Sequence, residues 1–203
     1  MIPLGMDFFN RDTVEVARDL LGRYLVRQDG SDVMICRITE TEAYVGAIDK
    51  ACHAYGGRRT ARTETLYAAT GTAYVYLIYG MYHCLNFVTE AEGIASAVLI
   101  RGCDPVYGVD EVSRRRFGVS RAAMTPYQRK NFMNGPGKLC KGLSIDKSCN
   151  NLSCGSNALY IADKIPELDL AARPPELPYH TGKRIGIDYA EEAIDFPWRF
   201  WLE

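Results

Sequence analysis

The amino-acid sequence predicts an α+β fold: one compact domain over residues 1–203, with a curved, mostly antiparallel sheet, a protruding β-hairpin and surrounding helices. Three observations support this prediction. A chain of 203 residues suits one ordinary domain or at most two small ones. Its 47% hydrophobic and 24% charged residues are typical of a globular protein. Its strand patterns occur in adjacent pairs and do not alternate with helices, which argues against a doubly wound nucleotide-binding sheet.

The N-terminal quarter predicts a helix followed by a hairpin. Asp12 and Glu15 form a capping-box pattern at the start of the helix, and a stripe of apolar residues follows at helical spacing. Residues 24–28 and 33–42 are expected to be two strands, because an Asp-Gly turn signal lies between them.

The rest of the chain continues the mixed pattern. The expected elements are strands at 72–79, 82–89 and 95–101, helices after Pro105, at Thr125-Pro126 and near Gly135, and short strands at 158–162 and 184–187. Gly80 lies at the bend between the first two of these strands, so they predict the hairpin that protrudes. The strand at 95–101 is nearly all apolar and is expected to be central in the sheet.

Charge is unevenly distributed along the chain. The net charge of −1 first argues against a globally basic nucleic-acid binder. Residues 101–150, however, contain 10 basic and 4 acidic residues, a net charge of +6. This segment is either a solvated face or a phosphate-binding surface on an otherwise neutral protein.

The cysteine pattern and the hydropathy indicate the cellular environment that we expect for the protein. The seven cysteines are scattered, and only Cys149 and Cys154 lie close together, so we expect reduced thiols in a cytoplasmic protein and no metal site. The apolar runs are too short to span a bilayer, and the first ten residues lack the basic region of a signal peptide.

Tyrosines and carboxylates gather in the first half of the chain. Seven of the 13 tyrosines lie between positions 44 and 82. They are either ordinary strand and core residues or the walls of a pocket for a flat ligand. Glu40, Glu42 and Tyr44 share one face of a strand. A carboxylate beside an aromatic wall can position a water as a general base, although spacing alone favours a solvated acidic edge.

Four sequence blocks resemble the alkyladenine (3-methyladenine) DNA glycosylase family. They are Arg37–Gly46 with Cys52-His53 and Gly56–Arg58, then Tyr74–Asn86, Ala97–Arg101 and Gly135–Cys140. Their order and spacing match, and the resemblance extends from about Phe8 to Leu202, as in a compact bacterial-type member. Ala61, Leu66 and His83 depart from the family pattern, which affects only the fine substrate preference.

The resemblance implies a monofunctional enzyme of base excision repair. Such an enzyme flips alkylated or deaminated purines (3-methyladenine, 7-methylguanine, hypoxanthine, ethenoadenine) out of duplex DNA and hydrolyses the N-glycosidic bond. By this match Glu42 is the general base for the attacking water, and Arg101 helps to hold that water. No lyase activity, metal or cofactor is expected, and the partner is double-stranded DNA bound by a monomer.

The resemblance also assigns binding roles. The residues matched to the base pocket are Tyr44, His53, Tyr76 and Asn86, the last of which crowds the guanine 2-amino group. Tyr79, with Met81 beside it, enters the minor groove and fills the vacated stack. Strand alternation places Tyr79 on the face opposite Tyr74 and Tyr76, so that wedge and pocket can be separate. Contacts to the DNA backbone are expected from Arg58, Lys138 and Tyr82.

Two other functions remain open at this point. A non-enzymatic lesion or single-strand binder would use the same tyrosines as a stacking platform, and would bind without releasing a base. A nucleoside hydrolase would act on free nucleosides and would need no basic surface.

Overall fold

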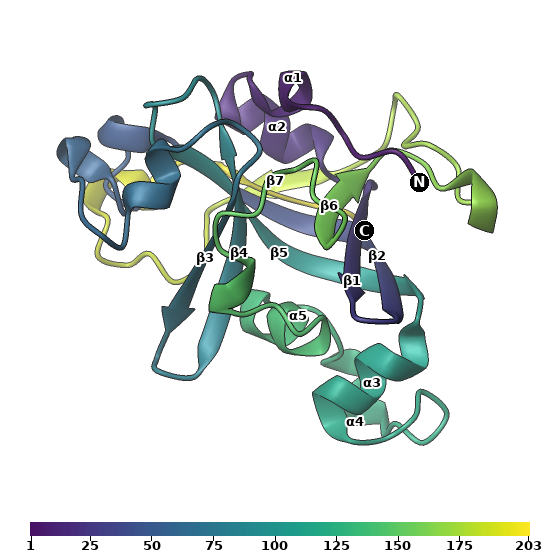
Figure 1. Cartoon of the computed structure of the whole chain (residues 1–203). Coiled ribbons are helices and arrows are strands. Elements are labelled where there is room, and N and C mark those ends of the chain that lie inside the picture. Colours follow the sequence, from purple (N-terminus) through teal and green to yellow (C-terminus); the bar gives the residue numbers. More distant parts are fainter.

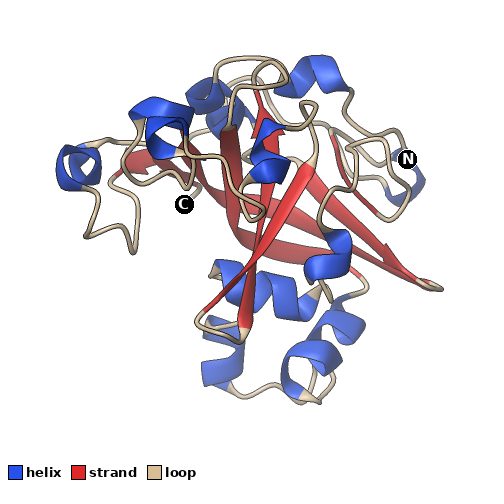
Figure 2. Ribbon diagram, turned by 60° about the vertical axis from the view of Figure 1, so that its left-hand side comes forward, coloured by secondary structure: helices blue, strands red, loops and turns tan.

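The computed structural model describes residues 1–203. Its main feature is one curled antiparallel sheet. Its strands are β1 (Tyr24–Asp29), β2 (Asp32–Tyr44), β3 (Ala73–Ile78), β4 (Tyr82–Thr89), β5 (Ser96–Tyr107), β6 (Leu159–Ala162), β7 (His180–Gly182) and β8 (Arg199–Trp201). The main order is β3-β4-β5-β2-β1-β6, with β8 paired to β2 and β7 to β8. The α+β prediction is therefore confirmed, and Figure 2 shows the sheet with helices above and below it.

The helices are short. They are α1 (Met6–Phe9), α2 (Thr13–Asp19), α3 (Val109–Phe117), α4 (Pro126–Lys130) and α5 (Pro136–Gly142), with 3-10 turns at Gly46–Ile48, Tyr55–Gly57, Glu64–Tyr67, Lys147–Cys149, Pro166–Leu168 and Glu191–Asp195. In Figure 1, α1 and α2 lie on one side of the sheet, and α3, α4 and α5 lie on the other. None of the helices is long and apolar enough to cross a lipid bilayer.

Strand β2 lies in the middle of the sheet and pairs with three other strands. On one side it pairs with β5 along most of its length, and on the other side it pairs first with β1 and then with β8. As a result Glu42 has neighbours on both sides, opposite Leu99 of β5 and Arg199 of β8.

The main core joins both helical layers to the sheet. Fully buried Val16 of α2, Ile100 of β5 and Leu139 of α5 belong to the same apolar cluster. A smaller, separate cluster includes Cys52, Leu66, Tyr74 and Ala97, with Tyr44, Tyr67 and Tyr76 packed against it. All seven cysteines are free and buried.

Local sequence signals fixed several element starts. The Asp12 side chain accepts hydrogen bonds from the backbone N–H groups of Val14 and Glu15, at 2.9 and 3.0 Å, and so caps α2 as predicted. Thr125 and Gln128 form a complete capping box at the start of α4. The hairpin of β3 and β4 also forms where Gly80 predicted it.

Two predictions about the sheet were wrong. Residues 184–187 are not a strand; their polar groups are engaged by Asp49 and Glu42, and β7 and β8 continue the sheet. The strand expected to end at Arg101 runs on to Tyr107, through Pro105, because a β-bulge in the pairing accommodates that residue. Gly108, with φ of 66°, then turns the chain into α3.

Candidate active site

A cavity of about 580 Å³ opens beside the β3–β4 hairpin. Residues from the predicted base pocket line it together: Tyr44, His53, Tyr76 and Asn86. The C-terminal segment contributes Ile185, Ile187 and Tyr189, and the opposite end of the wall comes from Gly135–Lys138. The lining is mostly apolar, with a few polar groups, which is the usual composition of a small-molecule site.

Glu42 lies immediately behind this wall. Its side chain is 0% exposed, and Tyr44, Leu99, Arg101 and Ile185, which surround it in the fold, all line the cavity. The Tyr44 hydroxyl donates a hydrogen bond to Oε2 at 2.8 Å, and the backbone N–H of Ile185 donates to Oε1 at 2.9 Å. Each carboxylate oxygen has a second lone pair, so this bonding leaves acceptor capacity for a water.

The protonation state of Glu42 is set by opposing effects. Burial is the largest effect and raises the pKa of the Glu42 carboxyl above its usual value, while the Arg101 charge, the Ile185 N–H and the Tyr44 hydroxyl act to lower that pKa. Burial and the neighbouring carboxylate raise the pKa of Tyr44 well above its usual value, so this phenol remains a hydrogen-bond donor. A general base needs a carboxylate that lies within reach of the reacting group and whose pKa is tuned by its surroundings.

Arg101 reaches the carboxylates through an irregularity in the sheet. Glu40 pairs with Gly102 and Thr41 pairs with Ile100, so Arg101 is the extra residue of a β-bulge on β5. Its Nε donates to Oε1 of Glu40 at 3.0 Å and lies 3.6 Å from Oε1 of Glu42. Arg199 of β8 also donates to Glu40, at 2.7 Å. Arg101 therefore lies beside the predicted base, although its hydrogen bond goes to Glu40.

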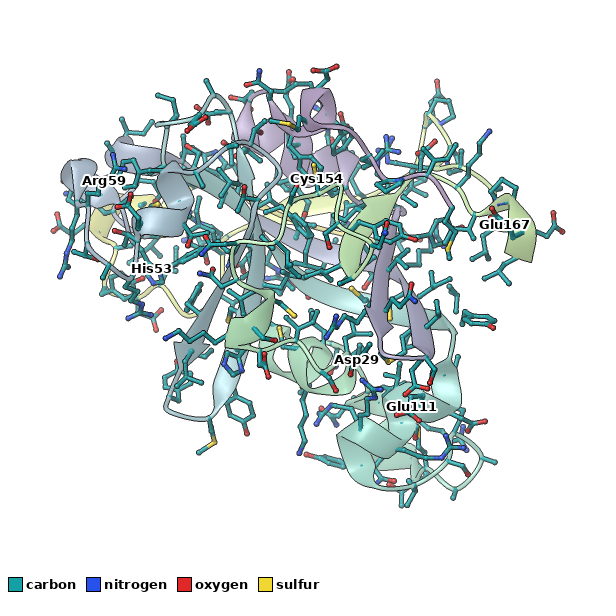
Figure 3. The ribbon with its side chains drawn as sticks, in the orientation of Figure 1. Asp29, His53, Arg59, Glu111, Cys154 and Glu167 are labelled. Carbon is teal, nitrogen blue, oxygen red and sulfur yellow. The ribbon has the colours of Figure 1, made fainter.

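The aromatic wall is a connected group. The His53 ring meets Tyr76 edge-on with centroids 4.6 Å apart, and its Nδ1 lies 3.0 Å from the Tyr74 hydroxyl. Burial, with the charges of Arg62 and Arg58, lowers the pKa of His53 to about 4. His53 is therefore a neutral imidazole at physiological pH. It belongs to the segment between β2 and β3, which packs at one end of the sheet (Figure 3).

Asn86 is fixed at the inner end of the pocket. It is 4% exposed on β4, and its Nδ2 donates to the backbone carbonyl of Tyr74 on β3 at 3.1 Å. The side chain is one of the residues that line the cavity.

The tip of the hairpin carries Tyr79 and Met81, which are 83% and 67% exposed. The strand ends at Ile78, one residue earlier than expected, and a tight turn follows, closed by a bond from the Met81 N–H to the Ile78 carbonyl. Tyr79 and Gly80 both have positive φ, 51° and 68°. The expected alternation does not extend to Tyr79, and its side chain lines the cavity with Tyr76. The expectation that Tyr79 faces away from Tyr76 was wrong, because both side chains line the same cavity.

The three predicted backbone contacts differ in position. Lys138 and Tyr82 line the cavity, whereas Arg58 is exposed in the loop after His53 and does not line it. Two asparagine side chains hold the Lys138 ammonium: Oδ1 of Asn131 at 3.0 Å and Oδ1 of Asn134 at 2.8 Å.

The basic segment divides into paired and unpaired cations. Arg101, Arg114 and Arg115 form ion pairs with carboxylates, and Arg115 alone meets Asp29, Asp32 and Glu111. Arg116 has no carboxylate partner, and it lines the cavity with Lys138. The sequence alone did not distinguish Arg116 from the other basic residues of segment 101–150, whose net charge is +6.

The C-terminal contribution to the site was also missed. Ile185 and Ile187 lie in the segment 184–187 that was predicted to be a strand, and Tyr189 follows that segment. Arg184 of the same segment forms a buried ion pair with Asp49, and no local pattern pointed to that pair.

Comparison with known proteins agrees with this geometry. A family model described as Methylpurine-DNA glycosylase (MPG) matches residues 7–203. The chain belongs to the methylpurine-DNA glycosylase family. It is thus a DNA-repair enzyme, a DNA glycosylase that hydrolyses N-glycosyl bonds.

Curated relatives match this glycosylase over nearly its whole length. A protein of Clostridium perfringens (strain 13 / Type A) is 52% identical over 201 residues, 98% of this chain and 95% of the relative. One of Desulfitobacterium hafniense (strain Y51) is 47% identical over 200 residues, again 98% and 95%. One of Clostridioides difficile (strain 630) is 46% identical, covering 97% of this chain and 98% of its own. All three are named for 3-methyladenine DNA glycosylase activity.

Proposed function

We propose that this glycosylase flips alkylated or deaminated purines out of duplex DNA into the tyrosine-lined cavity and cleaves their N-glycosidic bond with a water activated by Glu42. The observation that carries the proposal is the position of this carboxylate, buried directly behind a cavity whose walls are aromatic. The substrates would include 3-methyladenine, 7-methylguanine, hypoxanthine and ethenoadenine.

Flipping requires something to take the place of the extruded base. Tyr79 supports this role, because it is a flat and largely exposed side chain at the tip of a projecting hairpin, beside the cavity mouth. Met81 lies two residues further along the same tip. Unstacking costs least for a damaged or mismatched base, which favours lesions over normal nucleotides.

Recognition of the flipped base would rest on stacking. Tyr44, His53 and Tyr76 supply aromatic faces and edges around the cavity. A cationic alkylated purine is attracted to the faces of aromatic rings. Asn86, held in place by the Tyr74 carbonyl, would exclude bases by its bulk near the position of a 2-amino group.

Hydrolysis would proceed through an oxocarbenium-like sugar. The Glu42 carboxylate would accept a proton from the attacking water and stabilise the positive charge on the sugar, while Arg101 helps to hold the water. Lys138 is the one lysine that lines the cavity, and its ammonium is bonded to Asn131 and Asn134. An amine attack with strand cleavage is therefore not expected, and the product would be an intact abasic site.

Binding to the duplex would use several phosphate contacts. Lys138, Tyr82 and Arg116 at the cavity, with Arg58 in the exposed loop, are the candidates. Affinity for undamaged DNA should then be modest and should weaken steeply as salt rises. The proposal includes action as a monomer.

The test is single-turnover base release from duplexes containing hypoxanthine or 1,N6-ethenoadenine. We expect Glu42→Gln to slow release by about 10²- to 10⁴-fold, the usual contribution of a general base. Its binding to an abasic-site duplex should be retained, because the amide keeps the shape of the carboxyl. Glu111→Gln is the matched control, since Glu111 of α3 does not line the cavity and lies away from His53 (Figure 3).

Each other outcome contradicts a defined part of the proposal. Equal release by wild type and Glu42→Gln would remove the catalytic assignment. Tight lesion binding with no release from any duplex would indicate a binding protein. Salt-independent cleavage of free nucleosides would indicate a nucleoside hydrolase.

A further inference from the structure

A fully buried ion pair lies behind the cavity, between Arg184 and Asp49. The guanidinium and the carboxylate meet in two parallel contacts, Nη1 to Oδ2 at 2.5 Å and Nη2 to Oδ1 at 2.8 Å, and both side chains are 0% exposed. Such a two-pronged contact fixes orientation as well as distance.

The same two side chains tie three separate segments together. Arg184 donates to the carbonyls of Ala43 on β2, at 2.7 Å, and Ala193 in the C-terminal segment, at 3.2 Å. Asp49 accepts from the backbone N–H groups of Val45 at 3.1 Å and Ala51 at 2.9 Å. The end of β2, the loop that follows it and the C-terminal segment therefore share one polar anchor.

Both hydrogen-bond donors to Glu42 are attached to this anchor. Ile185, whose N–H meets Oε1, is the residue next to Arg184 in the chain. Tyr44, whose hydroxyl meets Oε2, has the Arg184 guanidinium 4.8 Å from the centre of its ring. The polar contacts of Arg184 thus set the position of both groups that hold the carboxylate.

Stability alone does not explain such a pair. Removing two charges from water carries a large desolvation penalty, and well-packed apolar residues of similar size stabilise a fold equally well or better. The pair instead supplies directional contacts, which apolar packing lacks.

We propose that Arg184 and Asp49 are positioning residues for catalysis: their ion pair holds the Ile185 N–H and the Tyr44 hydroxyl on the Glu42 carboxylate and so fixes its orientation and its ionised form. This inference rests on the proposed role of Glu42 as general base. Neither side chain lines the cavity, so both act through the residues that they hold.

The proposal has a signature in pH. Hydrogen bonds donated to a carboxylate favour its ionised form, and the Ile185 N–H and the Tyr44 hydroxyl both lower the pKa of Glu42. The other groups that face Glu42 are Arg101 from β5, Glu40 from β2 and Cys84 from β4, with Arg199 from β8 bonded to Glu40. None of these four is bonded to Arg184 or Asp49, so loss of the ion pair should change only the two donated bonds.

The experiment compares pH profiles of single-turnover base release from an ethenoadenine duplex, between about pH 4.5 and 9. The key variant is Arg184→Met/Asp49→Asn, which leaves no unpaired buried charge and keeps an amide oxygen for one of the two N–H groups, of Val45 and Ala51, that bond to different oxygens of Asp49. Arg184→Lys keeps the charge and one contact. Rates are normalised to folded, DNA-binding enzyme by titration with an abasic-site duplex.

We expect the acid limb of the double variant to move up by about one pH unit, so that release below the limb slows about tenfold, while the rate at alkaline pH changes much less. The acid limb of Arg184→Lys should lie between those of the wild type and the double variant. Arg115→Met is the matched control, because it breaks another arginine ion-pair cluster on α3 and should lower thermal stability without moving the limb.

Two outcomes would overturn the inference: a wild-type acid limb in the double variant, or no acid limb in any of these proteins. If the double variant fails to fold, Arg184→Lys decides alone, and an unshifted limb there rejects the positioning role. Failure of the proposed function looks different, because wild type itself would then release no base or Glu42→Gln would match it.

Discussion

Replacement of Tyr79 by glycine should separate the stability of the protein from its affinity for lesions. Tyr79 is 83% exposed, so its removal gives up little packing. Its φ of 51° is a left-handed conformation, which costs a non-glycine residue about 1–2 kcal/mol. Glycine avoids that strain. Its greater backbone freedom, however, stabilises the unfolded state by about 0.5–1 kcal/mol. Tyr79→Gly should therefore raise the free energy of unfolding by roughly 0–1.5 kcal/mol.

The same change should weaken DNA binding. Stacking of a base on an aromatic side chain contributes about 1–3 kcal/mol, which corresponds to a loss of about 5- to 150-fold in affinity. Fluorescence anisotropy with an ethenoadenine duplex measures this loss, and urea unfolding measures the stability. Tyr127→Ala is the control, because Tyr127 of α4 is 74% exposed and distant from the hairpin tip in sequence.

Either half of the reasoning can be refuted separately. A loss of more than about 1 kcal/mol of stability in Tyr79→Gly would mean that the tyrosine is held by contacts and is not strained. Unchanged affinity for the lesion duplex would remove the wedge role.

Two further predictions concern pH and packing. His53 has its pKa lowered to about 4 in the folded protein, against an ordinary 6.5, so the unfolded chain binds the extra proton between these values and stability falls as pH drops through this window. His53→Gln should remove a slope of up to about 1.4 kcal/mol per pH unit in urea unfolding, and His180→Gln, at an exposed site, should not. A Cβ at Gly137 would lie 2.9 Å from Cβ and 3.0 Å from Cγ of Tyr82. Gly137→Ala should cost about 1–3 kcal/mol and weaken duplex binding in anisotropy, whereas Gly135→Ala, 3.5 Å from the nearest atom, should be close to neutral.

Elements with local signals were predictable from the sequence. The Asp12 cap, the helix start at Thr125-Pro126 and the bend at Gly80 each depend on residues within a few positions of one another, and each formed as expected. The cavity wall was predictable in a different way, through the blocks that resemble a known family.

Features that depend on distant partners were not predictable. The bulge that carries Arg101 is a property of the pairing between β2 and β5, and neither strand shows it alone. The bond from Ile185 to Glu42 joins residues 143 positions apart, and the Arg184–Asp49 contact spans 135. The strand expected at 184–187 did not form, because this segment bonds to Asp49 and Glu42, which are far away in the sequence.

The late position of β8 has a consequence for the newly made chain. During synthesis, β1, β2 and β5 all leave the ribosome before β8 (Arg199–Trp201), which covers the second half of the β2 edge opposite Glu40–Glu42. Until then that edge has unpaired backbone groups, which are a template for association with other chains. Docking of the segment that carries β8 covers this edge, and the same segment contains Ile185, whose N–H is bonded to the Glu42 carboxylate.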